Sequence, residues 1–304
     1  MWQTDWNSPF WGWVWGICLW SGCFGTAYTG PFVTAHLMGQ LGNQFFIIAA
    51  ASATAWDHGA EPLFPELYSL THDPICRLHQ HRMRVFSQVN PSLLPRVIAE
   101  TYYEPQFSYD PIPYTPDMCL YGWFQSEKYF KKYKEKIVTL FSPSKEVLEY
   151  LQAKYSFILD HPKTVSVHMR TYLVEKTEDQ REAYVHYGRE YVEAAMSLFP
   201  EDALFVVFSN KMDWAKTELS GIERSILFIE GEAHYHDLYL MSLCKDNIIC
   251  NSSFSWWAAY LNPNPYKRVI VPPAWFSPHY VRDTRDLIPQ EWEILHMPMA
   301  EKTR

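Results

Sequence analysis

The sequence lacks several patterns that would place it in a class at once. It contains no CxxC pair, and its six cysteines are scattered through 304 residues, so neither a zinc site nor a disulfide framework is indicated. It also lacks an excess of positive charge. A formal net charge of −8 argues against nucleic acid or an anionic membrane as the main partner. What remains is a globular composition, 48% hydrophobic, with enough apolar material for one large domain or two ordinary ones.

Residues 1–30 lack basic residues altogether, although the stretch is apolar and rich in tryptophan and glycine. A signal peptide needs a positive start, but Asp5 stands there instead and the first Lys or Arg of the chain is Arg77. Two interpretations stay open for this segment. It is an extension that precedes the fold, or it is a membrane-associated segment within residues 10–30. The protein would accordingly be cytoplasmic or membrane-associated.

A strand, a glycine turn and a helix open the folded part. We expect a strand at Phe32–Leu37, a turn at MGQLGNQ, and a buried helix from Phe45 to Trp56 that Gly59 ends as a C-cap. This order is typical of the first βα unit of a Rossmann-like domain. Later, the proline-rich tract Glu104–Pro116 cannot be a central strand, so we expect a surface loop there.

The second half alternates strands and helices, which predicts a parallel, doubly wound sheet. We expect an N-terminal Rossmann-like domain at residues 31–160 and a second at residues 161–304, after the extension 1–30. The predicted linker is near Asp160–Pro162, after a helix at Ser144–Tyr155. In the second domain we expect strands at Thr164–Met169, Ala203–Phe208, Ile226–Ile229 and Arg268–Val271, with helices at Tyr187–Phe199 and from Asp213.

The stretch Tyr235–Asn262 reads as helix, strand, polar turn, helix. The strand is Asn247–Cys250, and the turn is Asn251, Ser252 and Ser253. Asn and Ser are strong N-cap residues, so the plainest interpretation is a well-capped helix. A helix start at the carboxyl end of a parallel strand is also where α/β sheets bind anions and nucleotides.

The letters DLYLMSLCKDNIICNSSFSWWAAYLN closely resemble the signature of the α-1,2-fucosyltransferase family, glycosyltransferase family 11. Two shorter segments agree: MGQLGNQ resembles the family's GGLGNQ, and CLYGWFQSEKYF resembles GYWQSEKYF. The resemblance implies an α/β fold of GT-B type, with two Rossmann-like domains facing a cleft. It implies an inverting enzyme that moves L-fucose from GDP-fucose to the 2-hydroxyl of a terminal galactose on a glycan. A eukaryotic member would act in the Golgi.

The resemblance also implies metal independence and no cofactor. The sequence agrees, because it has no DxD pair, and His79 and His81 have no further ligands at zinc spacing. In the glycine motif, the resemblance places Gly42 at the cleft and turns Asn43 toward the sugar and the acceptor. The tract Glu104–Pro116 would border the acceptor side.

The family's HxRRGDY motif is only partly kept, as His168-Met169-Arg170-Thr171-Tyr172. His168 and Arg170 match, and the resemblance makes them, with Asn43, the candidate catalytic residues. A guanidinium at Arg170 suits the phosphate oxygens of departing GDP. Thr171 stands where the family has a second arginine. Two outcomes stay open. A compensating cation comes from a loop, with Lys176, Arg181 and Lys211 as candidates, or the enzyme is slow, altered in donor or inactive.

In the polar turn, Asn251, Ser252 and Ser253 would contact the phosphates, and Phe254 would pack beside the donor. Asp237 either accepts hydrogen bonds from guanine or is simply an acid favoured at a helix start. No general base is identified. Because HxRRGDY is degraded, two alternatives stay open: a GT-B relative with another donor or linkage, and a non-catalytic glycan-binding or nucleotide-binding descendant.

Overall fold

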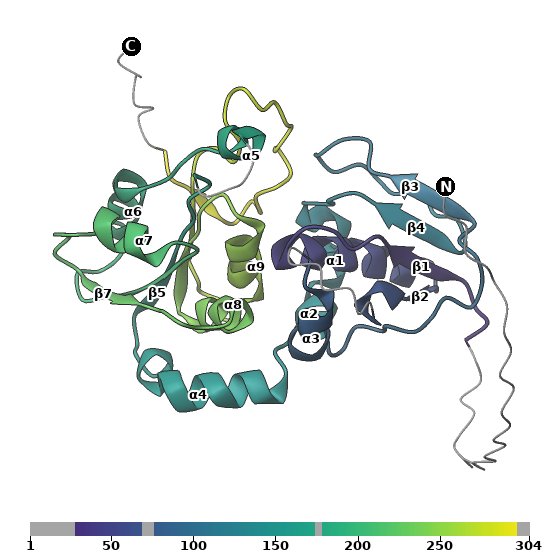
Figure 1. Ribbon diagram of the computed structural model, residues 1–304, viewed down its shortest axis with the longest axis horizontal. Coiled ribbons are helices and arrows are strands. Elements are labelled where there is room, and N and C mark those ends of the chain that lie inside the picture. Colours follow the sequence, from purple (N-terminus) through teal and green to yellow (C-terminus); the bar gives the residue numbers. More distant parts are fainter. Residues whose placement is uncertain (1–27, 69–75, 174–177, 297–304) are drawn as a thin grey trace, which may run out of the picture.

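The computed structural model describes residues 28–68, 76–173 and 178–296, which form two α/β domains, each built on a parallel sheet (Figure 1). The predicted anchor within residues 10–30 lies almost wholly outside this range. Across the described ranges, no helix combines the length and the apolar character needed to cross a membrane.

The N-terminal domain holds a four-stranded parallel sheet in the order β2-β1-β4-β3. Its elements are β1 (Phe32–Ala35), α1 (Leu41–Asp57), β2 (Glu61–Pro62), the 3₁₀ helix η1 (Pro65–Tyr68), α2 (Leu78–Arg84), β3 (Glu100–Tyr103), β4 (Met118–Tyr121), the 3₁₀ helices η2 (Glu127–Tyr129) and η3 (Lys131–Tyr133), and α3 (Lys134–Leu140).

Helix α1 begins at Leu41 rather than at Phe45, so Gly42 and Asn43 lie in its first turn and not in a loop. The predicted end holds: Gly59 adopts a φ of +64°, and the N–H of Ala60 turns back to the carbonyl of Ala55 at 2.9 Å. Nearly every side chain of α1 is buried, as the alanine-rich sequence predicts.

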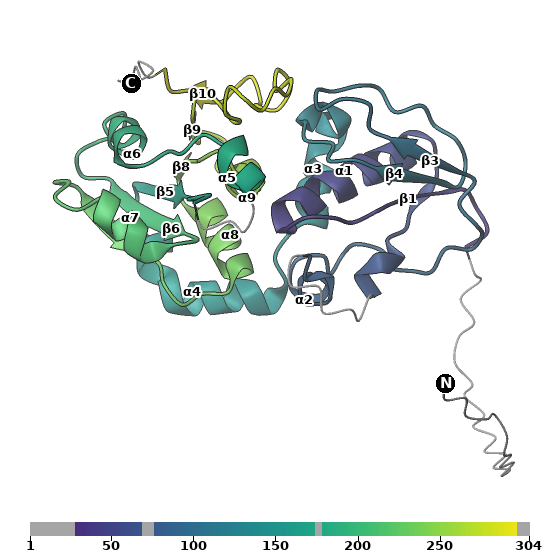
Figure 2. The ribbon, with the colours of Figure 1, turned by 45° about the horizontal axis from the view of Figure 1, so that its top comes forward.

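Helix α4 (Lys145–Leu159) joins the two domains along one side of the molecule (Figures 1 and 2). The hydroxyl of Ser144 caps it by accepting the N–H of Val147 at 3.4 Å, which confirms the predicted start. The helix is fastened to the C-terminal domain through Glu232, a carboxylate that is almost inaccessible to solvent. This carboxylate accepts hydrogen bonds from Tyr150, Lys154, Tyr155 and His236.

The C-terminal domain holds a six-stranded parallel sheet in the order β10-β9-β8-β5-β6-β7. Its elements are β5 (Thr164–Met169), α5 (Glu178–Ala183), α6 (Arg189–Met196), β6 (Leu204–Ser209), α7 (Met212–Glu218), β7 (Ser225–Phe228), α8 (His234–Leu243), β8 (Asp246–Ile248), α9 (Ser253–Leu261), β9 (Val269–Val271) and β10 (Glu293–Ile294). Chain order runs outward from β5 in one direction and from β8 in the other. The sheet is therefore doubly wound, and its topological switch point lies between β5 and β8.

Aromatic packing joins the domains where α1 meets α9. The ring centroids of Phe46 and Trp256 lie 4.5 Å apart, those of Phe45 and Trp257 lie 5.1 Å apart, and all four side chains are fully buried. The predicted α/β fold of GT-B type, with two Rossmann-like domains facing a cleft, is confirmed. The exact domain limits at residues 30 and 160 stay predictions.

Candidate active site between the two domains

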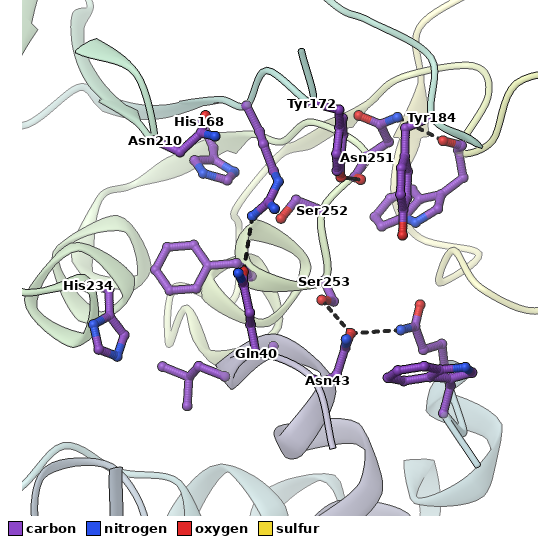
Figure 3. Close-up of a pocket in the computed structure, with 18 of the residues that line it drawn as sticks. Gln40, Asn43, His168, Tyr172, Tyr184, Asn210, His234, Asn251, Ser252 and Ser253 are labelled. Carbon is purple, nitrogen blue, oxygen red and sulfur yellow. Dashed lines mark hydrogen bonds between the residues drawn. The ribbon is translucent and has the colours of Figure 1, made fainter. Parts of the chain in front are cut away.

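A cleft of about 500 Å³ lies between the domains (Figure 3). Every site residue predicted from the sequence lines it: Gly42, Asn43, His168, Arg170, Asp237, Asn251, Ser252, Ser253 and Phe254. The roles assigned to the individual side chains stay predictions. Their convergence from four separate segments is a property of the fold.

The switch point of the C-terminal sheet supplies the centre of this cleft. Arg170 directly follows β5, and the polar turn that follows β8 leads into the first turn of α9. Ser252 occupies the N-cap position of α9 with extended backbone angles, but its hydroxyl makes no capping hydrogen bond, so the predicted side-chain cap is wrong. Figure 3 shows Ser252 pointing into the cleft instead. The N-terminus of α9 and its serine side chain thus face the space in which an anion would lie.

Arg170 reaches from the end of β5 to the N-terminal domain, where its Nη1 donates to Oε1 of Gln40 at 3.3 Å. Its guanidinium carbon lies 4.9 Å from the ring centroid of Tyr172. The hydroxyl of Tyr172 donates to the carbonyl of Asn251 at 2.6 Å, which ties the segment after β5 to the turn after β8. Both sides of the switch point are therefore held in fixed relation.

Thr171, which replaces the second arginine of the family motif, is buried in the fold. Its backbone N–H donates to Oδ1 of Asn210 at 3.0 Å, and its carbonyl accepts Nδ2 of the same residue at 3.0 Å. Its hydroxyl accepts the N–H of Leu173 at 3.2 Å. This position therefore stabilises the loop, and its side chain supplies no charge to the cleft.

The expected compensating cation is not found among the described candidates. Arg181 and Lys211 do not line the cleft, and Lys176 lies outside the described residues. Two other arginines do line it: Arg77 at the start of α2 and Arg282 in the loop before β10. Neither arginine lies in a motif, so the sequence alone does not indicate that they belong to the cleft.

His168 is buried beside Cys250, with its Nδ1 at 3.1 Å from the cysteine sulfur, and its ring centroid lies 5.5 Å from that of Phe254. Burial, with a smaller contribution from nearby Arg170, lowers the pKa of His168 to about 3. The imidazole is therefore neutral near pH 7 and a weak proton acceptor. Its contacts fit a residue that positions the strand end and Phe254.

Asn43 links the two domains. Its Oδ1 accepts the hydroxyl of Ser253 at 2.8 Å and the side-chain amide of Gln125 at 2.9 Å (Figure 3). Gly42 lies at the same contact, because a Cβ added there would come within 2.5 Å of the backbone N of Phe254. The glycine of the LGN motif is therefore required by the close approach of α1 to the start of α9.

Asp237 lies in the first turn of α8, and its Oδ1 is buried without a hydrogen-bond partner among the residues that the structure describes. Burial raises the pKa of this carboxyl to about 7, and the negative charge of Glu232 adds to the rise. A buried carboxyl oxygen without a partner is costly to a fold and is consistent with an external hydrogen-bond donor.

His81 and His234 face each other across the domain boundary near Asp237, with their Nε2 atoms 2.7 Å apart. The other ring nitrogen of His81 lies 2.7 Å from Oε1 of Gln44. His81 is thus held as an interdomain contact. Within the described ranges, no group of three or more His, Cys, Asp or Glu side chains could hold a metal ion.

Asn251 anchors two loops from inside the fold. Its Nδ2 donates to the carbonyl of Val185 at 2.9 Å and to that of Trp275 at 2.7 Å. Both amide protons are therefore used within the protein, and the phosphate contact predicted for this residue remains untested.

An aromatic wall completes the cleft and was not predicted from the sequence. Its members are Phe107, Trp123, Tyr184, Phe276 and Tyr280. Trp123 lies in the CLYGWFQSEKYF segment, and Phe107 lies in the proline-rich tract expected at the acceptor side. The sequence of these two segments could therefore have indicated both residues as candidates for the cleft.

Known glycosyltransferases are similar to this chain in sequence. An Escherichia coli protein, "Alpha-1,2-colitosyltransferase", is 32% identical over 177 residues, covering 56% of this chain and 60% of that protein. The chain thus spans less than two thirds of that relative. A rabbit (Oryctolagus cuniculus) protein, "Galactoside alpha-(1,2)-fucosyltransferase 2", is 26% identical over 283 residues, covering 84% of this chain and 77% of that protein.

Among solved structures, the fucosyltransferase NodZ from Bradyrhizobium is similar, with 14% identity and a TM-score of 0.47 over 78% of this chain and 94% of that chain. Because this TM-score is below 0.5, the fold assignment rests on the topology of this chain itself. The sequence profile of glycosyl transferase family 11 matches residues 100–295, which include β3 to β10 and most of the cleft. The chain belongs to glycosyl transferase family 11.

Proposed function

We propose that the protein is an inverting glycosyltransferase that moves L-fucose from GDP-fucose to the 2-hydroxyl of a terminal galactose on a glycan. The observation that carries the proposal is the convergence of Arg170 and the N-terminus of α9 on one cleft, opposite Asn43 of the other domain. This arrangement offers positive charge to a leaving diphosphate and leaves the N-terminal domain for the acceptor.

The chemistry follows from this placement. Breaking the bond between fucose and the β-phosphate develops negative charge on the phosphate, and preorganised donors at that position lower the barrier. Arg170 supplies a permanent charge with a planar, bidentate geometry, and the start of α9 supplies N–H groups and the hydroxyl of Ser252. A single displacement by the acceptor hydroxyl inverts the anomeric centre, and in this proposal the proton of that hydroxyl passes to the departing phosphate. In this proposal the reaction needs no metal ion.

Asp237 is the proposed contact for the guanine base. Its buried carboxyl oxygen has no partner among the described residues, and guanine offers two neighbouring N–H donors along its Watson–Crick edge. A carboxylate can accept both. The helix-start alternative leaves this buried oxygen unexplained, because an acid that serves only the helix dipole gains nothing from burial.

A second candidate differs only in the donor. The name of the E. coli relative reads "Alpha-1,2-colitosyltransferase", and Thr171 departs from the family motif beside the donor site. Colitose could therefore replace fucose as the transferred sugar.

The decisive experiment is a donor and acceptor screen. The purified protein is incubated with GDP-fucose or GDP-colitose and with β-galactoside acceptors, and the linkage of the product is determined by NMR. Arg170→Ala is the active-site control, and Lys211→Ala is its matched control, because Lys211 is exposed and outside the cleft. An α-1,2-linked fucoside with wild-type protein and Lys211→Ala, but not with Arg170→Ala, supports the proposal. GDP binding without transfer or donor hydrolysis would instead indicate a non-catalytic descendant.

A further inference from the structure

The segment Gly122–Gln125, which follows β4, forms part of the N-terminal wall of the cleft. Trp123 and Gln125 both line the cleft. The side-chain amide of Gln125 donates to Asn43, which also accepts the hydroxyl of Ser253 from the opposite domain. The position of this short segment therefore sets both an aromatic surface of the cleft and a hydrogen bond at the domain boundary.

Glu104 holds this segment with both oxygens of its carboxylate. Oε2 accepts the backbone N–H of Trp123 at 2.6 Å, and Oε1 accepts that of Phe124 at 2.9 Å. The backbone N–H of Glu104 donates to the carbonyl of Tyr121 at 2.9 Å, which anchors the residue to the end of β4. Successive backbone N–H groups that converge on one anion form a nest, and here the anion belongs to the protein.

The backbone of the segment is shaped around this carboxylate. Phe124 is fully buried and has a φ of +50°, a left-handed conformation that a bulky residue rarely adopts. A Cβ added to Gly122 would lie 2.4 Å from the Cβ of Glu104 and 2.8 Å from its Oε2. The glycine leaves room for Glu104, and the hydrogen bonds of Glu104 stabilise the unusual turn at Phe124.

The carboxyl of Glu104 interacts electrostatically with Arg282, a residue that lines the cleft. Burial raises the pKa of Glu104 to about 7, while the N–H groups of Trp123 and Phe124 and the positive charge of Arg282 lower it. Arg282 lines the cleft from the C-terminal domain, whereas Glu104 is not among the lining residues. Glu104 thus acts on the cleft through the segment that it holds.

We propose that Glu104 is a positioning residue for the acceptor sugar, whose carboxylate holds the indole of Trp123 and the amide of Gln125 as the acceptor-side wall. An aromatic face with a few fixed polar groups is the usual lining of a site that orients a small ligand. The donor-side groups, Arg170 and the start of α9, belong to the other domain. Glu104 should therefore affect the acceptor far more than the donor, because it reaches the donor side only through Gln125, Asn43 and Ser253. The inference rests on the proposed glycosyl transfer.

Glu104→Gln tests it, because the amide keeps the shape but offers one accepting oxygen for two N–H groups. The expected result is a rise of about tenfold or more in KM for the galactoside acceptor. The Kd for GDP and the rate of GDP-fucose hydrolysis without acceptor should stay within about twofold of wild type. Hydrogen exchange at the amides of Trp123 and Phe124 should become faster. Glu100→Gln is the matched control, because Glu100 lies exposed on β3 and its carboxylate accepts the hydroxyl of Thr115 at 2.7 Å rather than backbone N–H groups of the cleft wall. It should change none of these quantities.

The proposal is overturned if folded Glu104→Gln keeps the wild-type acceptor KM, or if its affinity for GDP falls as much as its affinity for the acceptor. A wild-type protein that transfers no sugar would end the proposed function instead. Exchange would still test the holding role in that case: unchanged rates at Trp123 and Phe124 would exclude it, and faster rates would support it.

Discussion

Asp237→Asn should raise the stability of the protein while it weakens the binding of GDP. The pKa of this carboxyl rises from 3.8 to about 7 in the folded chain, chiefly through burial. The folded state therefore keeps a proton that the unfolded state has lost, and the stability from this group is full below about pH 3.8 and is lost as the pH rises through about 7. At about 1.4 kcal/mol per pH unit, the ionised carboxylate costs the folded state up to about 4 kcal/mol at pH 8.

Asparagine removes this cost, because its side chain does not titrate. We expect the free energy of unfolding of Asp237→Asn at pH 8 to exceed that of wild type by a few kcal/mol, up to the limit of about 4 kcal/mol set by the raised pKa. At pH 4 the two should be nearly equal. Urea unfolding at both pH values measures the difference.

Binding should move in the opposite direction. A hydrogen bond to a charged acceptor contributes about 1.5–3 kcal/mol, so the Kd for GDP should rise about tenfold to a hundredfold in Asp237→Asn at pH 8. Below about pH 7 the wild-type advantage should shrink, because binding must then release the proton. Calorimetric titrations of GDP into both proteins give the ratio of the two Kd values at each pH. The protonation of the GDP phosphate affects both values equally and cancels in this ratio.

Asp213→Asn is the matched control, since Asp213 also lies in the first turn of a helix but is exposed. It should alter neither the unfolding free energy nor the Kd by much. Equal GDP affinity of wild type and Asp237→Asn would refute the guanine contact. A loss of stability at pH 8 would refute the argument from burial.

Three further predictions follow from the cleft. Arg170→Ala should lower kcat for transfer by about 10²–10³ in a folded protein. Arg170→Lys should also have a low kcat, because a point charge lacks bidentate geometry. Near-normal turnover in either variant would remove Arg170 from the mechanism. Gly42→Ala should lower the melting temperature and transfer together, because its Cβ would collide with the backbone of Ser253 and Phe254; a wild-type melting curve would contradict the close approach. Transfer should survive EDTA, since the described residues include no candidate metal cluster, and a loss that Mn²⁺ or Mg²⁺ restores would contradict this.

Sequence patterns predicted the alternation of the longer strands and helices, because burial periodicity is a local property. They missed the short elements β2, α2, β3, α5 and β10, and other errors came at the ends of elements. Helix α1 takes up the LGN motif that glycine content assigned to a loop, since its first turn packs on α9. Strand β8 stops at Ile248 because the chain must leave the sheet before the polar turn. Of the three turn residues, Ser252 takes the N-cap position, yet its hydroxyl makes no capping hydrogen bond and points into the cleft (Figure 3).

The candidate site was predicted only where a motif marked it. Arg170, Asn43 and the turn Asn251–Ser253 lie in segments with a distinctive local sequence, and the structure brings them to one cleft. Arg282 lies in no motif, and Glu104 lies in the proline-rich tract, whose sequence gives no role for this carboxylate. Their place depends on loops that return to the cleft from elsewhere in the chain.

By itself the sequence determined the alternation of strands and helices, the family resemblance and the residues at the strand ends, because each depends on residue type and short spacing. Only the tertiary structure decided that Gly42 touches the start of α9, that Thr171 is buried where a second arginine was expected, and that Asp237 has no partner for its buried oxygen among the described residues. These features depend on contacts between residues distant in the chain, within one domain or between the two, and such contacts leave no period or spacing in the sequence.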